Sequence, residues 1–312
     1  MLSIPGRMMN SGVPGKGGVP SDTGGWVDLH LHSCCSDGSD RPAEVVRRAA
    51  ALGMSGLALT DHDSVQGLDE AAGAARQYGL GFLNGVEISA GCGGIEVHVT
   101  GLGVRPENGL FQETVSGLAG GRSRRFLDMA RRLQDAGYPV LEHAEAAVRD
   151  GRPCGRMNLA ARLKEMGVTR TVQEGFDRFL KPGGAGYVPK PLIPVEDAIK
   201  AVHAAEGLAF VAHPALSKSL LRLLPELLKR PFDGIEAYHV SHSPAQVGEL
   251  LDLARARGLY VAGGSDCHGT IKGQAPEMGR VRVQLAVIRP LLERLGVNGQ
   301  WIIDNGQRRR DA

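Results

Sequence analysis

The sequence is poor in aromatic residues, almost neutral overall and free of long apolar runs. Only 4% of its 312 residues are aromatic, and 36 basic against 34 acidic residues leave a net charge of +2. So small a net charge excludes a global electrostatic field that would draw the protein to nucleic acid or membrane. Any anionic substrate must therefore be held by local groups. No apolar run approaches the ~18 residues that a membrane span requires.

Cysteine is also scarce. The five cysteines are odd in number and show no paired spacing, which is unlike a disulfide framework. The first 25 residues lack the continuous apolar stretch of a secretory signal. We therefore expect a protein of the reducing cytoplasm, with no membrane association.

The remaining composition divides the chain into five parts. Residues 1–25 are rich in Gly, Pro and Ser without an apolar period, and we expect a disordered tail. Strand and helix patterns alternate over 26–105 and again over 190–304, which predicts an α/β fold built on a parallel sheet or barrel with crossover helices. Only helical patterns occupy 106–189, which we interpret as a helical insertion, and 305–312 is expected to be a frayed end.

The expected elements follow from periodicity and capping signals. A short strand starts at Trp26, and further strands are expected at 56–60, 81–88, 94–103, 208–212, 234–238 and 259–264. Helices are expected at 40–52, 67–78, 110–118, 122–136, 142–150, 157–166, 172–180, 194–206, 220–229 and 244–257.

The first strand ends in two histidines on one face. Residues two apart in a strand point to the same side, about 7 Å from each other, so His30 and His32 suit a pair of metal ligands. Taken alone, the pair also fits a strand end whose imidazoles merely form hydrogen bonds. Nearly every later strand, however, delivers further residues of this kind, namely Asp61, His62, Asp63, Glu87, His98, His213, His239, Asp266 and His268.

This clustering predicts a metal centre at the carboxyl ends of the strands, where functional groups collect in parallel α/β folds. Imidazoles and carboxylates without thiolates favour zinc, manganese or iron at a hydrolytic centre. One carboxylate among many imidazoles commonly bridges two ions, and Glu87 is the best candidate for that bridge. His143 and His203 fall inside helices and are interpreted as surface or packing residues.

The ordered motifs resemble those of the PHP family, the polymerase and histidinol phosphatase domain. They are DLHLHS at 28–33 with SDG at 36–38, TDHD at 60–63, GVE at 85–87 with VHV at 97–99, AHP at 212–214 and SDCH at 265–268. The resemblance covers residues 26 to about 285 and implies a distorted (β/α)7 barrel with two or three divalent metal ions.

The resemblance also implies how these ions are held. One ion would be bound by His30, His32, Glu87 and Asp266, and a second by Glu87, His98 and His213. A third would be bound by Asp37, His62 and His268. Some members have a His where Asp37 stands, and an Asp is a harder and weaker ligand, so full occupancy of the third site is the open point.

Segments of the insertion resemble the small stand-alone PHP phosphoesterases, which include 3′,5′-nucleoside bisphosphate phosphatases and 5′→3′ exoribonucleases. These segments are GRMNLA at 155–160, FDRFL at 176–180 and YVPK at 187–190. The group commonly has Gly-Arg-Pro-His where this chain has Met157 and Asn158. Arg156 remains, and its planar guanidinium suits a phosphate because it donates two parallel hydrogen bonds.

The predicted chemistry is metal-assisted hydrolysis of a phosphomonoester. The substrate is expected to be a nucleotide with phosphate at both the 3′ and 5′ positions, or the 5′ end of a short RNA. Arg156, His239, Lys190 and Asn158 are expected to bind the substrate. Arg156, with His239 or Lys190, would neutralise charge on phosphate oxygens, and Asp63 or His239 would act at the leaving oxygen.

Two alternatives remain open from the sequence. The chain could be a histidinol-phosphate phosphatase, although those relatives commonly lack the insertion, or a non-catalytic scaffold module. The complete ligand set argues against the scaffold. A solvated helix face is the favoured interpretation of one basic group, and a cleft-lining position would instead favour a nucleic-acid substrate. This group is Arg122, Arg124, Arg125, Arg131 and Arg132.

Overall fold

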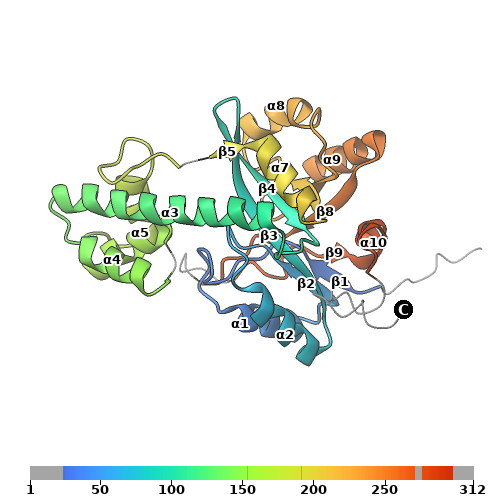
Figure 1. Ribbon diagram of the computed structural model, residues 1–312, viewed down its shortest axis with the longest axis horizontal. Coiled ribbons are helices and arrows are strands. Elements are labelled where there is room, and N and C mark those ends of the chain that lie inside the picture. The colour runs from blue at the N-terminus through green and yellow to red at the C-terminus, as the bar shows by residue number, and fades with distance from the viewer. Residues whose placement is uncertain (1–23, 153, 191, 271–275, 298–312) are drawn as a thin grey trace, which may run out of the picture.

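In the part of the chain that the structure describes, seven strands follow one another around the core in the order β8-β7-β6-β4-β3-β2-β1. A computed structural model describes residues 24–152, 154–190, 192–270 and 276–297 (Figure 1). The strands are β1 (Trp26–Asp28), β2 (Gly56–Leu59), β3 (Gly81–Cys92), β4 (Ile95–Leu102), β6 (Leu208–Val211), β7 (Gly234–His239) and β8 (Tyr260–Gly264). Two short strands lie outside this order, β5 (Ile193–Pro194) beside β3 and β9 (Val283–Gln284) beside β1.

Backbone hydrogen bonds close the ring between its first and last strands. The amide of Leu29 donates to the carbonyl of Gly263 at 3.1 Å, and the amide of Asp266 donates to the carbonyl of His30 at 3.0 Å. A parallel bridge between Leu31 and Cys267 continues this seam. The predicted distorted (β/α)7 barrel is thus confirmed.

The expectation of an all-parallel arrangement is wrong at β4. This strand runs antiparallel to both β3 and β6. The cause is the turn Gly93-Gly94, in which both residues have positive φ (57° and 78°), as a tight two-residue hairpin requires. His98 therefore reaches the functional end of the barrel from the first half of its strand, opposite Ser89 on β3.

Six helices cover the outside of the barrel. Their apolar faces, such as Leu220, Leu224 and Leu227 of α8, are buried against the strands. The helices are α1 (Pro42–Ala51), α2 (Leu68–Tyr78), α7 (Val195–Ala204), α8 (Lys218–Leu227), α9 (Pro244–Arg257) and α10 (Leu285–Arg294). The helix α10 and the strands β5 and β9 have no counterpart among the elements expected from the sequence.

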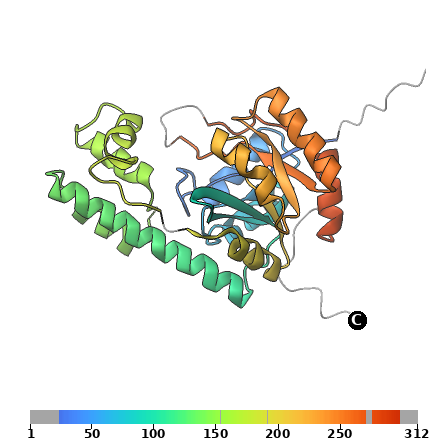
Figure 2. The ribbon, with the colours of Figure 1, turned by 90° about the horizontal axis from the view of Figure 1, so that it is seen from above.

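The helices between β4 and β5 project to one side of the barrel (Figures 1 and 2). They are α3 (Gly109–Asp135), α4 (Leu141–Arg149), α5 (Arg156–Glu165), α6 (Val172–Gly175) and the π-helix η1 (Phe176–Leu180). We call them the helical layer. The two helices expected at 110–118 and 122–136 are one helix of 27 residues, and the single helix expected at 172–180 changes to a π-helix at Phe176.

Two hydrophobic cores explain why α3 continues through its glycines. Its first half buries Phe111, Val115 and Leu118 against the barrel. Its second half buries Phe126 and Leu133 in a separate core with α4, α5 and η1. A helix anchored at both ends is stabilised by packing rather than by its intrinsic propensity.

Some expectations lie beyond what this structure tests. The predicted tail at 1–25 (except Gly24 and Gly25) and the frayed end at 305–312 lie outside the described residues. The insertion boundaries at 106 and 189 stay predictions. Among the helices that the structure describes, none combines the length and apolar character that crossing a bilayer would take.

Candidate metal centre

The predicted metal ligands converge at one end of the barrel. Their potential donor atoms fall into overlapping groups, each within 4.8 Å. One group is His30, His32, Glu87 and Asp266, a second is His32, Asp37, His62 and His268, and a third is His62, Glu87 and His98. His213 adjoins the third group, with its Nε2 2.9 Å from Glu87 Oε1. Residues that are up to 238 positions apart in the sequence, from His30 to His268, are thus gathered into one cluster.

Glu87 occupies the middle of this cluster and is fully buried. Its Oε1 lies 2.7 Å from His98 Nδ1, and its Oε2 lies 3.0 Å from His62 Nδ1. Burial acts to raise the pKa of Glu87, but the surrounding imidazoles, foremost His62 and His98, hold it well below the ordinary value. The side chain is therefore an anion that faces imidazoles from both oxygens, as a bridging ligand does.

The cluster has unsatisfied atoms that fit cations. Glu87 Oε2 and His62 Nδ1 are buried without a hydrogen bond, although they lie 3.0 Å apart. His30 Nε2 and His32 Nε2 lie 3.1 Å from each other, and both are also near Glu87 Oε2. Buried polar atoms are rarely left unpaired. Divalent ions bound by these nitrogens and oxygens would satisfy the unpaired atoms. Such donors suit zinc, manganese or iron.

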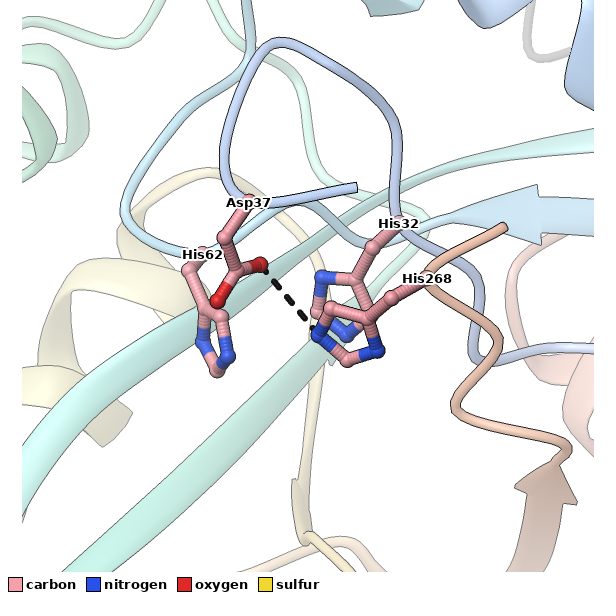
Figure 3. A group of neighbouring side chains, drawn as sticks. All are labelled: His32, Asp37, His62 and His268. Carbon is pink, nitrogen blue, oxygen red and sulfur yellow. Dashed lines mark ion pairs between the residues drawn. The ribbon is translucent and has the colours of Figure 1, made fainter. Parts of the chain in front are cut away.

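The second group is formed around a loop carboxylate (Figure 3). Asp37 Oδ1 lies 3.2 Å from His268 Nε2, and the His268 ring stacks on that of His32 at 4.2 Å. His268 Nδ1 lies 2.8 Å from the carbonyl oxygen of Asp266. If Nδ1 carries the proton, Nε2 is left free to bind an ion beside Asp37.

The loop that carries Asp37 is held by a buried carboxylate. Asp61 accepts hydrogen bonds from the Ser33 amide at 2.7 Å, the Ser33 hydroxyl at 2.6 Å and the Ser36 hydroxyl at 2.5 Å. This fixes the loop between β1 and α1 from both sides. Asp61 therefore acts on the cluster through the position of Asp37.

Glu236 is a functional residue that the sequence interpretation missed. It is fully buried on β7, where its two oxygens lie 2.9 and 3.0 Å from His30 Nδ1. It also accepts hydrogen bonds from the Thr100 hydroxyl and the His213 amide. Such a carboxylate orients a ligand histidine and strengthens its binding. The available signal was a charged residue in the middle of an otherwise apolar strand.

The backbone around the cluster is strained. Among the described residues other than glycine, four have positive φ, and three of them belong to this region: Asp63 (51°), His213 (28°) and Asp266 (53°). Left-handed conformations are unfavourable for residues with a Cβ atom and persist where function requires them. The strain aims these side chains in directions that an extended strand end would not allow.

Cationic side chains from the helical layer face the cluster across a cavity of about 120 Å³. The cavity is lined by Asp37, His62, Glu96, His98, Arg122, Arg125, Gly155, Arg156, Met157, Phe176 and Lys190. The favoured interpretation of the basic group on α3 as a solvated face is wrong for Arg122 and Arg125, whereas Arg124 and Arg131 are exposed. The helix places alternate arginines on opposite sides, which composition alone does not reveal.

Asp63 holds Arg122 at the edge of this cavity. Asp63 Oδ2 accepts from Arg122 Nη2 at 2.6 Å, and its two oxygens also accept from the amide and hydroxyl of Ser89. Both charged side chains are largely buried, at 17% exposure for Arg122 and 3% for Asp63. The pair joins α3 to the loop after β2.

The other predicted substrate residues lie in different settings. Arg156 stacks over the Phe176 ring at 4.9 Å in the cavity, and Lys190 Nζ lies 2.6 Å from Glu96 Oε1. His239 is buried, with its Nε2 3.4 Å from Asp266 Oδ2. Asn158 does not line the cavity. Its Oδ1 accepts from the Gly155 amide at 3.0 Å, so it caps the start of α5.

The chain is similar in sequence to several known proteins. The PHP domain profile matches residues 28–146. A 3′,5′-nucleoside bisphosphate phosphatase of Chromobacterium violaceum is 34% identical over 274 residues, which cover 86% of this chain and 96% of that protein. A 5′-3′ exoribonuclease of Haemophilus influenzae is 32% identical over 245 residues, which cover 77% of this chain and 89% of the relative.

Solved structures agree with these relatives. A crystal structure from Bifidobacterium adolescentis, assigned as a metal-dependent phosphoesterase, matches with a TM-score of 0.75 at 30% identity. The match covers 86% of this chain and 96% of that one. The barrel, the converging donors and these relatives define a metal-dependent phosphoesterase, a hydrolase. The chain belongs to the PHP domain family, as its ordered motifs predicted.

Proposed function

We propose that the protein hydrolyses the 3′-phosphate of 3′,5′-nucleoside bisphosphates. The observation that carries this proposal is the cavity in which metal donors and four cationic side chains meet, namely Arg122, Arg125, Arg156 and Lys190. One phosphate at the metal cluster does not require all four cations. A second phosphate on the same nucleotide would use the cations farther from the cluster, and the Chromobacterium relative is named for such a substrate.

The ion assignment is part of the proposal. His30, His32, Glu87 and Asp266 would hold one ion, Glu87, His98 and His213 a second, and Asp37, His62 and His268 a third. The donor groups support the first and third sets. The second is supported by the distances of 2.7 Å from His98 Nδ1 and 2.9 Å from His213 Nε2 to Glu87 Oε1. When bound, the ions supply charge that stabilises phosphoryl oxygens and an activated water. The native metal is proposed to be manganese, zinc or iron.

The chain's own residues would bind and orient the phosphate. Arg156 is held over Phe176 and lines the cavity, and its planar guanidinium would donate two parallel hydrogen bonds to a phosphate there. Arg122 is fixed by Asp63, so Asp63 would act by positioning this cation. Donors that are held in place before the substrate arrives stabilise developing charge without reorganisation.

His239 and Lys190 are assigned supporting roles. His239 is buried against Asp266, and its Nδ1 accepts a hydrogen bond from the Ser241 amide. That arrangement leaves Nε2 to hydrogen-bond or protonate near the leaving oxygen. Lys190 is available to a phosphate only in competition with Glu96. Asn158 would contribute through the start of α5 rather than by touching the substrate.

The cellular compartment and the binding partners are also part of the proposal. None of the five cysteines forms a disulfide, which supports a reducing cytoplasm. The proposed partner is the nucleotide itself. A short oligoribonucleotide bound by its 5′ end is the second candidate, and it is supported by Arg122 and Arg125 in the cavity.

A phosphate-release screen with Mn²⁺ tests the proposal. The substrates are an adenosine 3′,5′-bisphosphate, the 3′- and 5′-monophosphates, a short 5′-phosphorylated RNA and histidinol phosphate. We expect the highest kcat/KM for the bisphosphate and release of its 3′-phosphate only. The Glu87→Gln protein, purified in parallel, controls for contaminating phosphatases.

Each other outcome selects a different function. Preference for the RNA, with release of mononucleotides from the 5′ end, would identify an exoribonuclease. Preference for histidinol phosphate would overturn the substrate class. Absence of release with Mn²⁺, Zn²⁺, Fe²⁺ or Mg²⁺ would identify a scaffold module.

A further inference from the structure

The cavity that gathers four cations also contains a carboxylate, that of Glu96. Its side chain is 40% exposed and extends from β4 toward the space that a phosphate would occupy. A carboxylate in this position repels an anionic substrate. We therefore expect the Glu96 carboxylate to interact with a group other than the substrate.

That partner is the imidazole of His98. Glu96 and His98 are two residues apart on β4, so their side chains share one face of the strand. Glu96 Oε1 lies 3.0 Å from His98 Nε2, whereas His98 Nδ1 lies 2.7 Å from Glu87 Oε1. The ring thus spans two carboxylates, one at the cavity wall and one at the centre of the metal cluster.

When an ion is bound, a neutral His98 ring can serve Glu96 and the ion together only if its one proton is on Nε2. A neutral imidazole carries its proton on one nitrogen and a lone pair on the other. If Nε2 donates to Glu96, the lone pair of Nδ1 is directed to the side of Glu87. If the proton were on Nδ1, it would occupy the space in which an ion must meet the ring.

Glu96 is itself held in place by the segment that returns from the helical layer. Lys190 Nζ lies 2.6 Å from Glu96 Oε1. The backbone just before Lys190 is fixed to α3, since Arg125 Nε donates to the Val188 carbonyl at 2.9 Å and Arg132 donates to the Tyr187 carbonyl. A long surface glutamate is thereby kept in one orientation.

We propose that Glu96 is a positioning residue for His98, keeping the ring proton on Nε2 so that Nδ1 binds the ion shared with Glu87. This inference rests on the metal sites of the proposed function and assigns Glu96 no contact with the substrate. It explains why an anion stands in an anion-binding cavity. Its strength is expected to resemble that of other carboxylates behind ligand histidines, whose loss typically weakens metal affinity about 10- to 100-fold.

The first test reads the ring proton directly. Long-range ¹H–¹⁵N spectra of the zinc-loaded protein are recorded at pH 7, with His98 assigned by comparison with His98→Gln. We expect the proton on Nε2 in the native protein and in Glu96→Gln, whose amide oxygen still accepts. In Glu96→Ala the Nε2 proton is expected to exchange with water and disappear. A proton on Nδ1 of native His98 would overturn the proposal.

The second test measures zinc binding without substrate, by competition with a chromophoric chelator. Glu96→Ala is expected to weaken one ion about 10- to 100-fold and to leave the others unchanged. Glu96→Gln is expected to stay within about fivefold, because its amide oxygen still accepts the hydrogen bond from Nε2 and only the charge is lost. Glu145→Ala, which removes an exposed glutamate of α4, is the matched control and should bind zinc as the native protein does.

The outcomes separate this inference from the proposed function. Native zinc affinity in Glu96→Ala would show that Glu96 only neutralises Lys190, and would overturn the inference while the metal centre stands. Failure of the native protein to bind zinc would overturn this inference, and failure to bind manganese and iron as well would overturn the proposed function. Failure of the phosphate-release screen alone would leave the Glu96 result unaffected, because neither test uses a substrate.

Discussion

The barrel edge and the helical layer contribute opposite kinds of side chain to one cavity. On the barrel side the groups are imidazoles and carboxylates, mostly buried, and some are held by a further residue, as Glu236 holds His30. On the helical side they are arginines of α3 and α5, together with Lys190 in the segment that follows η1, and the helices have a hydrophobic core of their own. The barrel edge therefore offers donors that suit cations, and the helical layer offers charges that suit anions.

The cation donors and the positive charges therefore belong to different parts of the molecule. The metal-binding side depends on precise directions, so it rests on strands, strained turns and a dense hydrogen-bond network. The anion-binding side depends on charge and reach, which helices with separate packing can supply. On the proposed function, substrate preference would change through the arginines that line the cavity, which do not contact the proposed metal ligands. Four measurements test whether the two sides act independently.

Replacement of Glu87 by Gln should have the largest effect. The amide keeps the size of the side chain but removes the charge that five imidazoles surround. We expect loss of bound metal and a fall in kcat/KM of about a thousandfold, because metal ions supply several kcal/mol to such reactions. Metal analysis and phosphate release measure both. Unchanged metal content would show that Glu87 is not a bridging ligand.

Replacement of Arg122 by Gln should affect the other side only. We expect kcat/KM to fall about a hundredfold, the usual loss for one preorganised charge-stabilising donor, with metal content unchanged. Arg124→Gln is the matched control, since Arg124 lies on the same helix but is exposed, and should stay within twofold. Equal losses in the two variants would mean that orientation on α3 does not matter.

Removal of the ions should weaken the barrel edge more than the helical layer. At a free metal concentration of 100 Kd, bound metal adds about 2.7 kcal/mol of stability, which a chelator removes. Hydrogen exchange should then increase around Asp37, His62 and Asp266, while amides of α4 and α5 keep their protection. Equal increases in both regions would show that the two unfold as one unit.

The smallest expected effect belongs to Thr100→Val. The substitution keeps the shape of the side chain and removes one hydrogen bond to Glu236, of 2.7 Å. Loss of such a bond costs about 1 kcal/mol, so metal affinity should fall about fivefold. The KM for substrate should not change at saturating metal. A change in KM alone would place Thr100 with the substrate-binding groups.

The barrel edge could largely be predicted from the sequence because its donors follow short apolar strands. His30, His62, His213 and Asp266 each lie just beyond a recognisable strand, and the fold brings such positions to one edge. The direction of β4 was not predicted, since Gly93-Gly94 was interpreted within a strand–helix rhythm. Glu236 was missed because its partner is 206 residues away.

The helical layer was less predictable for a physical reason. Helical periodicity shows which residues share a face but not which face meets another part of the molecule. Arg122 and Arg124 are therefore equivalent in the sequence and differ only after α3 has packed on the barrel. Asn158 likewise was expected to meet the substrate and instead caps a helix, because local backbone partners were available to it.

The left-handed backbone of Asp63, His213 and Asp266 lowers thermal stability, whereas their side chains are placed in the site. A residue with a Cβ atom in this conformation costs about 1 kcal/mol relative to glycine. A laboratory population selected only for survival at high temperature would be expected to acquire glycine at these positions. Each such gain would remove a carboxylate or an imidazole from the site. Thermostable variants should therefore be screened for metal content before any of them is used as a catalyst.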